Sequence, residues 1–218
     1  MASALISLNV GKPIAVEYQG KVLETGIYKE PIQGDVFLGK EQIDGDGQAD
    51  LVNHGGADKA VCVYPYEHYA YWENQLGKSL QYAAFGENLT VTGMLESDVC
   101  IGDVYQVGDA ILQVSQPRFP CYKLSQKHGV ADLPVQFLKT GYSGFYFRVL
   151  REGYLNSTSR IDQLESHAAQ VSVVEVLRLL ASSPKDRDPE VLQHMIKLEV
   201  LSSVTRQRFQ KWLDEGAF

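Results

Sequence analysis

The sequence predicts a mixed α+β protein, in which a β-rich, barrel-like domain is followed by a small unit of three helices. Short β-branched and aromatic runs bounded by Gly, Asp or Pro fill residues 1–168, whereas capping signals and helical spacing dominate residues 169–218. No glycine-rich phosphate motif of the Rossmann or P-loop type occurs. With 44% hydrophobic and 22% charged residues, the chain has the balance of a folded globular protein.

The expected strands of the first domain are short and separated by turn signals. Such a pattern favours an antiparallel sheet or barrel over a doubly wound fold. One helix is expected among them at residues 65–76, because Pro65 suits the first helical position and Gly77 suits the end. Most of its aromatic residues are expected in the core. The expected strands cover residues 4–10, 14–18, 26–28, 35–37, 59–64, 88–91, 104–107, 110–115 and 143–150.

Capping signals place three helices in residues 169–218. Ser172 and Glu175 form a capping-box pattern before an apolar run that ends at Leu180. Asp188, followed by a proline, precedes a second helix at 191–201, and Ser203 precedes a third at 204–213. Each helix is too short to be stable alone, so we expect the three to pack on one another or on the barrel.

Charge and cysteine content limit the partners and the compartment. The net charge of −7, from 20 basic and 27 acidic residues, disfavours a nucleic-acid partner, which needs a basic surface. The N-terminus lacks the pattern of a signal peptide, and no run reaches the ~18 apolar residues of a membrane helix. Three cysteines are too few and too odd in number for a disulfide framework. We therefore expect a cytoplasmic protein with neither a nucleic-acid nor a membrane partner.

The most unusual segment is residues 115–124, Ser-Gln-Pro-Arg-Phe-Pro-Cys-Tyr-Lys-Leu. It follows an expected strand, and its two prolines fix the backbone without donating hydrogen bonds. Cys121 has Arg118 and Lys123 close in sequence, and neighbouring cations favour the thiolate, the form that attacks substrates or binds metals. Local sequence leaves a buried free cysteine as the alternative. That alternative is what we expect for Cys62 and Cys100.

Two further clusters offer polar groups to a ligand. Gly55 and Gly56 let backbone amides approach a ligand, Lys59 could complement a phosphate, and His54 could act as a hydrogen-bonding group, a base or a metal ligand. Residues 86–88, Gly-Glu-Asn, carry donors and acceptors suited to a polar heterocycle. Taken alone, a loop histidine such as His54 is more often a solvated or locally bonded side chain, and the 86–88 cluster is explained equally well by a turn that leads into a strand.

Taken together, these clusters resemble the MOSC family, named for the C-terminal domain of molybdenum cofactor sulfurase. The resemblance is strongest to its stand-alone branch, the N-hydroxylaminopurine resistance proteins, which carry three C-terminal helices. It runs over nearly the whole chain. The matching segments are Thr-Gly-Ile-Tyr-Lys at 25–29, Gly-Asp-Gly-Gln-Ala-Asp at 45–50, His-Gly-Gly at 54–56, Phe-Gly-Glu-Asn-Leu at 85–89 and the whole of 115–124.

The resemblance implies a barrel-like domain that binds the molybdenum cofactor (Mo-molybdopterin), with Cys121 as both the molybdenum ligand and the catalytic residue. The implied reaction is the reduction of N-hydroxylated purines, pyrimidines and related N–OH compounds, a detoxification independent of pyridoxal phosphate. Since no flavin, haem or iron–sulfur motif is present, electrons would come from a separate reductase of the flavoprotein or ferredoxin type. The residues implied to contact the pterin or its phosphate are His54, Gly55, Gly56, Lys59, Glu87, Asn88, Ser115 and Arg118.

Two other functions stay open at this stage. One is a non-catalytic carrier of the cofactor or of its sulfur. The other is an enzyme with a cysteine nucleophile, in which Cys121, His54 and Asn88 serve as thiolate, base and orienting group. The sequence also leaves open the physiological substrate, the electron donor, the role of the C-terminal helices and the oligomeric state, a homo-oligomer included.

Overall fold

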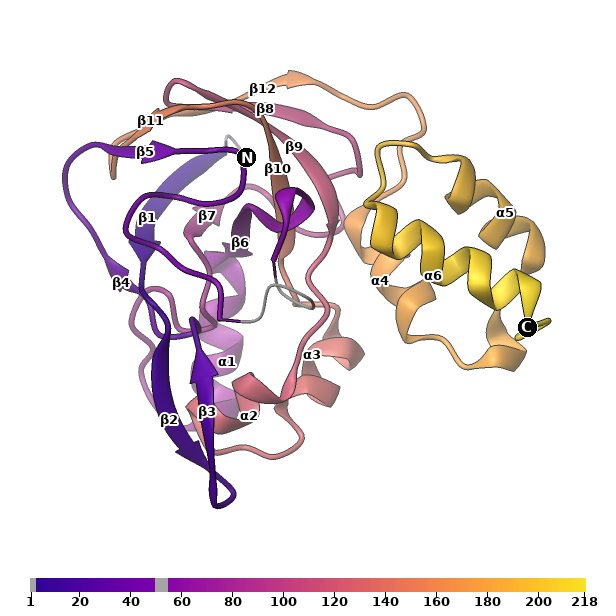
Figure 1. Cartoon of the computed structure of the whole chain (residues 1–218), viewed down its shortest axis with the longest axis horizontal. Helices are drawn as coiled ribbons and strands as arrows, with labels where there is room; N and C mark the ends of the chain where they lie inside the picture. The colour runs from indigo at the N-terminus through magenta and orange to yellow at the C-terminus, as the bar shows by residue number, and fades with distance from the viewer. Residues whose placement is uncertain (1–2, 50–54) are drawn as a thin grey trace.

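A computed structural model describes residues 3–49 and 55–218 and confirms the mixed α+β class (Figure 1). Its centre is an eight-stranded sheet that curls into a half-barrel. In spatial order the strands are β12 (Ile161–Glu165), β8 (Val104–Val107), β9 (Ala110–Pro117), β10 (Phe145–Arg151), β6 (Val61–Pro65), β7 (Leu89–Thr92), β1 (Ala4–Val10) and β4 (Glu30–Pro31). Two small sheets pair β2 (Ile14–Tyr18) with β3 (Lys21–Thr25), and β5 (Val36–Leu38) with β11 (Gly153–Leu155).

The pairings in the large sheet are antiparallel except between β6 and β7, where Val63 lies opposite Leu89 in a parallel register. A parallel pair needs a crossover connection. Here the crossover contains the 3₁₀ turn η2 (Tyr66–His68) and helix α1 (Tyr69–Leu76). The inner face of the sheet is apolar and fully buried at positions such as Leu112, Phe145 and Phe147. This topology sets the C-terminal end of β9 beside the start of β10.

The expectation of a single helix in the first domain is wrong. Besides α1 and the 3₁₀ turn η1 (Ala57–Lys59), it contains α2 (Tyr122–His128) and α3 (Leu133–Thr140). Helices α2 and α3 each end at a glycine in the left-handed region, Gly129 at φ 75° and Gly141 at φ 80°, which is a common way for a helix to end. Residues 26–28, expected as a strand, form a connection instead. The strands that the sequence reasoning missed are β3, β4, β11 and β12.

Helices α1 and α3 enclose a second, aromatic core. Trp72 stacks on Phe137 with ring centroids 4.4 Å apart, and Phe85 packs on Tyr64 at 4.6 Å. Tyr69 and Trp72 of α1 are buried as expected, whereas Tyr66 and Tyr71 remain partly exposed.

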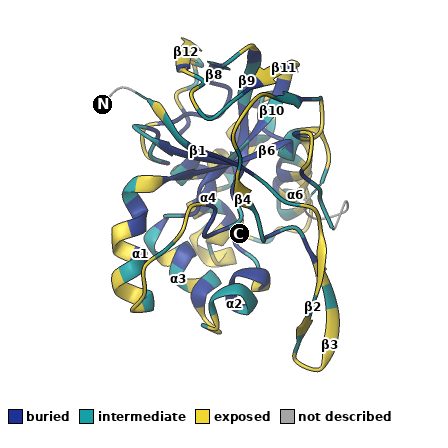
Figure 2. Cartoon of the chain, turned by 90° about the vertical axis from the view of Figure 1, so that its left-hand side faces the viewer, coloured by how far each residue is buried: buried dark blue, intermediate teal, exposed yellow. Residues whose placement is uncertain are grey.

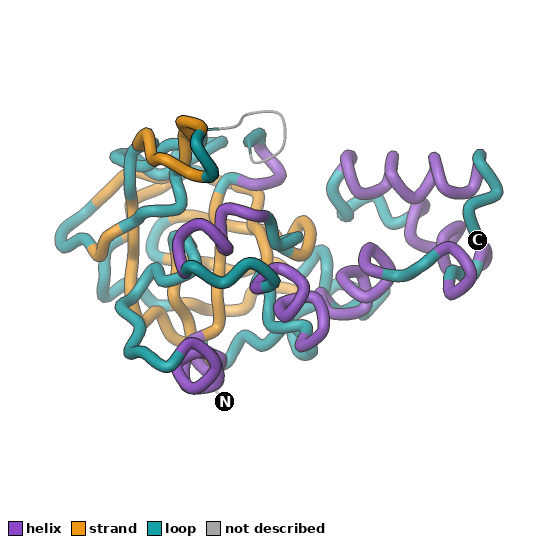
Figure 3. Tube along the Cα trace, turned by 90° about the horizontal axis from the view of Figure 1, so that it is seen from below, coloured by secondary structure: helices purple, strands orange, loops and turns teal. Residues whose placement is uncertain are grey.

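The C-terminal helices confirm the capping signals. Ser172 and Glu175 form both bonds of the capping box at α4 (Val173–Ala181), and Asp188 caps α5 (Pro189–Lys197). Ser202, one residue earlier than expected, caps α6 (Ser203–Asp214). The helices stand beside the barrel (Figures 1 and 3), and their buried side chains join the same apolar cluster as the sheet. The boundary at 168/169 stays a prediction.

Among the described helices, none combines the length and the apolar character that a membrane span requires.

Candidate functional site

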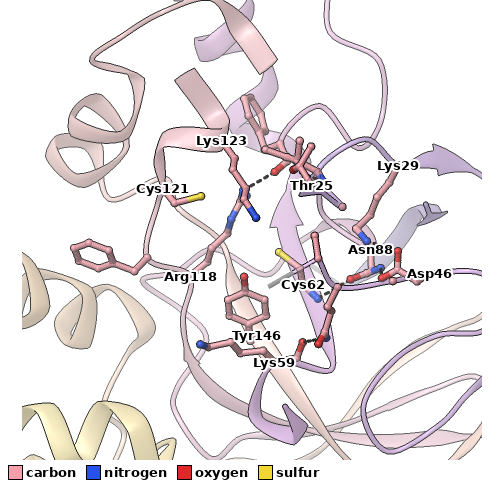
Figure 4. Close-up of a pocket in the computed structure, with 18 residues that line it drawn as sticks. Thr25, Lys29, Asp46, Lys59, Cys62, Asn88, Arg118, Cys121, Lys123 and Tyr146 are labelled. Carbon is pink, nitrogen blue, oxygen red and sulfur yellow. Dashed lines mark hydrogen bonds and ion pairs between the residues drawn. The ribbon is translucent and has the colours of Figure 1, made fainter. Parts of the chain in front are cut away.

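A pocket with about 650 Å³ of empty space, part of it open to solvent, lies where several distant segments meet (Figure 4). Cys121, Arg118 and Lys123 lie on one side of it, and Lys29, Asp46 and Asn88 on the other, with Cys62 and Tyr146 between them. The remaining described lining residues are Thr25, Gly26, Ile27, Gly47, Gln48, Ala49, Lys59, Phe85, Gly86 and Phe119.

Glycines allow the walls of the pocket to approach one another. A Cβ on Gly26 would lie 2.5 Å from the carbonyl oxygen of Gly47. Gly86 has φ +84°, and a Cβ there would lie 2.7 Å from Cγ1 of Ile27. No larger residue fits these approaches, because real Cβ contacts are longer and the left-handed backbone disfavours side chains. These contacts account physically for Gly26 in the segment 25–29 and for Gly86 in the segment 85–89.

Cys121 occupies the position immediately before helix α2 and is partly exposed to the pocket. The connection from β9 to α2 consists of residues 118–121, so Arg118 and Cys121 lie at its two ends. The Arg118 side chain is buried, and its Nη2 donates to the carbonyl oxygen of Phe85. Its Nη1 is also buried and has no hydrogen-bond partner within the described residues. A buried unpaired guanidinium donor is costly, so its place in a pocket wall favours an anionic ligand there.

The pocket carries an excess of positive charge. Of the described lining residues, four are cations, Lys29, Lys59, Arg118 and Lys123, and one, Asp46, is an anion. Asp46 forms a buried ion pair with Lys29, so it neutralises that cation. Lys123 is 7% exposed, and within the described residues no hydrogen bond of its ammonium group is seen. Burial alone would lower the pKa of Arg118, but the neighbouring Cys62, Tyr146 and Cys121 raise it above its ordinary value, so the guanidinium stays charged.

Two protonated groups line the inner part of the pocket. Burial raises the pKa of the Cys62 thiol to about 11, and burial also raises the pKa of the Tyr146 hydroxyl. Both groups therefore keep their protons at neutral pH. The expected burial of Cys62 is confirmed, but no local pattern indicated that this side chain lines a pocket.

Of the residues predicted to bind a ligand, the structure brings Lys59, Asn88, Arg118 and Cys121 to the pocket. The Asn88 amide makes hydrogen bonds inside the protein: Oδ1 accepts from the Cys62 amide at 3.0 Å, and Nδ2 donates to Asp46 Oδ2 at 2.9 Å. Asn88 thus links β6 to the Lys29–Asp46 pair. Asn88 also lines the pocket, and its contact with a pterin stays a prediction.

The other predicted residues that the structure describes do not line the pocket. Glu87 is fully buried, and its carboxylate accepts from the Tyr69 hydroxyl, the Phe85 amide at 3.0 Å and the Thr90 hydroxyl at 3.1 Å. The Ser115 hydroxyl donates to the carbonyl oxygens of Asp58 and Tyr146. Gly55 and Gly56 precede η1 and are absent from the described lining, and His54 lies outside the described residues. Their contact with a ligand stays a prediction.

Sequence reasoning did not single out Lys29, Asp46, Lys123 and Tyr146 as site residues. The first three lie within or next to the segments quoted for the resemblance, so their charges were the available signal. Tyr146 sits on β10 with no local pattern to distinguish it from a core tyrosine.

Comparison with known proteins gives a consistent family. Residues 50–162 match the model of the MOSC domain. The uncharacterized protein YflK of Bacillus subtilis is 47% identical over 211 residues, which are 97% of this chain and 95% of that protein. The crystal structure of YiiM from Geobacillus stearothermophilus superimposes with a TM-score of 0.82 at 37% identity, covering 97% of this chain and 99% of that one.

A longer relative, named Reductase, comes from Gibberella moniliformis. It is 36% identical over 165 residues, which are 74% of this chain but 29% of that protein.

Proposed function

Because this chain belongs to the MOSC domain family, we propose that its pocket binds the molybdenum cofactor and that the loaded protein reduces N-hydroxylated purines, pyrimidines and related N–OH compounds. One observation carries the proposal: a partly exposed thiol, Cys121, and a buried unpaired guanidinium nitrogen of Arg118 line the same positively charged pocket. The name of the fungal relative supports the class of reaction.

The residues of the pocket fit this cofactor. A dithiolene-bound molybdenum takes a soft thiolate, and Cys121 is the more exposed of the two cysteines in the pocket. The phosphate of the cofactor is an anion, and both Arg118 and Lys123 offer it cationic donors. The pocket is open to solvent on one side, so a ligand can enter it.

Each part of the pocket has a distinct task in the proposed reaction. When bound, the cofactor would supply the two electrons that, with two protons, convert the N–OH group to N–H and release water. A separate reductase of the flavoprotein or ferredoxin type would restore these electrons. Arg118 and Lys123 would bind the negatively charged phosphate of the cofactor. The Lys29–Asp46–Asn88 network stabilises the opposite wall of the pocket. The Tyr146 hydroxyl keeps its proton and can donate a hydrogen bond into the pocket. We place the reaction in the cytoplasm, where free cysteines such as these three persist.

The test is the molybdenum content per chain, measured by elemental mass spectrometry on protein from a host that makes the cofactor. We expect nearly one molybdenum per wild-type chain and a sharp fall in Cys121→Ser. Cys100→Ser is the matched control, because Cys100 is buried away from the pocket lining, and it should retain the metal.

Turnover is then measured with N-hydroxylaminopurine and a chemical or protein electron donor. Reduction that requires both the metal and Cys121 supports the proposal. Full metal content without turnover under any donor indicates a carrier of the cofactor instead. Activity in protein from a cofactor-deficient host, abolished by thiol alkylation, indicates a cysteine nucleophile.

A further inference from the structure

The turn η1 is held by three separate elements of the fold. Its residue Asp58 accepts a hydrogen bond at Oδ2 from the amide of Ser203, the first residue of α6, at 3.2 Å. Asp58 Oδ1 accepts from Nε of Arg148 on β10 at 2.9 Å, and the two side chains form an ion pair. The Asp58 carbonyl oxygen accepts from the Ser115 hydroxyl on β9 at 2.6 Å. One aspartate thus connects the C-terminal helices to two strands of the barrel.

The next residue, Lys59, lies on the pocket side of the same turn. Lys59 lines the pocket, whereas Asp58 is not among the lining residues. Tyr146 also lines the pocket (Figure 4), and Arg148 follows it by two positions on β10, so both side chains lie on one face of the sheet. The turn η1 therefore lies along this face, with Lys59 toward the pocket and Asp58 toward α6.

Helix α6 has a second contact with the pocket wall. The guanidinium of Arg208 lies 5.5 Å from the ring centroid of Phe119, which lines the pocket two residues before Cys121. Just before the helix, the Ser202 amide donates to the carbonyl oxygen of Ser115 at 2.9 Å. The start and the middle of α6 therefore meet the wall of the pocket at two places.

The exposure of the Asp58–Arg148 pair indicates what it contributes. The Asp58 side chain is 28% exposed and that of Arg148 is 19% exposed. Ion pairs that water reaches contribute little to the free energy of unfolding. The carboxylate also lies at the positive end of the α6 dipole, an interaction that acts over the first turn of a helix only. The main effect of these contacts is therefore on where η1 lies, and with it the Lys59 ammonium group.

We propose that Asp58 is a positioning residue, which holds Lys59 in the pocket wall and couples ligand binding in the pocket to the contact of α6 with the barrel. This inference rests on the proposed function for the identity of the ligand, an anionic cofactor. It gives the C-terminal helices a role in binding, although the described residues that line the pocket all precede α4. Coupling of this kind is reciprocal, so a ligand that binds Lys59 also strengthens the contact between Ser203 and Asp58.

The first experiment needs no substitution. The full chain is purified with the cofactor from a competent host and without it from a cofactor-deficient host, and hydrogen exchange of the Ser203 amide is measured by nuclear magnetic resonance. We expect this amide to exchange several-fold more slowly in the loaded protein. The Glu190 amide, which donates to Asp188 at the start of α5, is the internal control and should exchange at the same rate in both proteins. An equal rate for Ser203 in both would overturn the proposal.

The second experiment tests whether Asp58 acts through Lys59. Asparagine has one acceptor oxygen, so Asp58→Asn cannot accept from both Arg148 and Ser203. We expect Asp58→Asn and Lys59→Met each to lower the molybdenum content several-fold, and the double variant to fall no further than Lys59→Met alone. Independent effects would multiply, and that result would contradict the proposal.

Ser202→Ala is the matched control, because it removes the hydroxyl that caps α6 and leaves both contacts of the Asp58 carboxylate in place. It should retain its molybdenum, and a loss equal to that of Asp58→Asn would assign the effect to a general weakening of α6 and refute the positioning role. If the wild type holds no molybdenum, the proposed function fails, and inorganic phosphate replaces the cofactor in both experiments. Asp58→Asn should then raise the dissociation constant of phosphate several-fold by calorimetry, and an unchanged constant, or no binding to the wild type, would overturn this inference as well.

Discussion

The most direct test of the site assignment is the substitution Glu87→Gln. The resemblance implied that Glu87 contacts the pterin, whereas the structure buries its carboxylate completely and surrounds it with three protein donors. Glutamine has the same shape but presents an amide nitrogen in place of one oxygen. If its oxygen keeps the hydroxyls of Tyr69 and Thr90, its nitrogen faces the Phe85 amide, and two donors then oppose each other.

The cost follows from these contacts. One hydrogen bond to a charged acceptor is lost, worth ~1.5–3 kcal/mol, and two others become weaker neutral bonds, so we expect a loss of about 2–4 kcal/mol of unfolding free energy. For a chain of this length that corresponds to a fall in melting temperature of about 10 °C. The removal of a buried charge offsets part of the cost, which is why the upper figure is not higher.

The assay combines urea unfolding with the molybdenum content of the folded variant at low temperature. We expect Glu87→Gln to unfold at a lower urea concentration and to retain its molybdenum, because the carboxylate does not line the pocket. Glu17→Gln, an exposed position on β2, is the control and should match the wild type in both respects. A variant that is as stable as the wild type but has lost the metal would refute the reasoning and restore Glu87 as a ligand-binding residue.

Three other substitutions probe the pocket, the protonation of a buried histidine and the packing of the C-terminal helices. Arg118→Lys should lower the molybdenum content several-fold and leave the circular dichroism spectrum unchanged. The guanidinium donates a hydrogen bond to the Phe85 carbonyl and still has a second nitrogen without a partner within the described residues, and one ammonium group cannot do both. Full retention of the metal would contradict this prediction. Burial lowers the pKa of His128 to about 4. Below pH ~6.5 this histidine therefore binds a proton in the unfolded chain but not in the folded chain, so the free energy of unfolding falls as the pH falls from about 6.5 to about 4. His128→Gln should remove this component, measured as a smaller shift in the urea midpoint between pH 7 and pH 5, and an equal shift in both proteins would count against it. Phe209→Ala, at a fully buried position of α6, should cost about 3–5 kcal/mol in urea unfolding, and a loss below ~1 kcal/mol would show that the C-terminal helices do not share the core.

The elements that could be predicted from the sequence are those with local signals. The capping box at Ser172 and the cap at Asp188 lie within one turn of the helices that they start, so position along the chain is enough to find them. Helices α2 and α3 were missed because each is a short segment behind a proline-rich or polar stretch. Their glycine stops, Gly129 and Gly141, were the overlooked signals. The parallel pairing of β6 with β7 has no local signature, because it depends on the surfaces that distant strands present.

The same distinction applies to the pocket. Cys121 and Arg118 could be predicted from one segment of unusual composition, and both line the pocket. Glu87 is buried and does not line the pocket, and the sequence could not show this, because a carboxylate that accepts hydrogen bonds from the protein and one that accepts them from a ligand are the same residue in the sequence. Cys62 and Tyr146 reach the pocket only through the pairing of β6 with β10, which the sequence does not display.

The long-range pairing of the sheet also has a kinetic consequence. Leu8 pairs with Leu89, and Phe145 pairs with Val63, so the strands that carry the pocket walls meet only after large chain loops have closed. Closure of such large loops makes folding slow, and the pocket is therefore not yet formed in early folding intermediates. A ligand that needs every wall therefore binds after the folding transition state. Such a ligand should slow unfolding and leave the folding rate unchanged, and the unloaded chain must persist in its folded form until the ligand arrives.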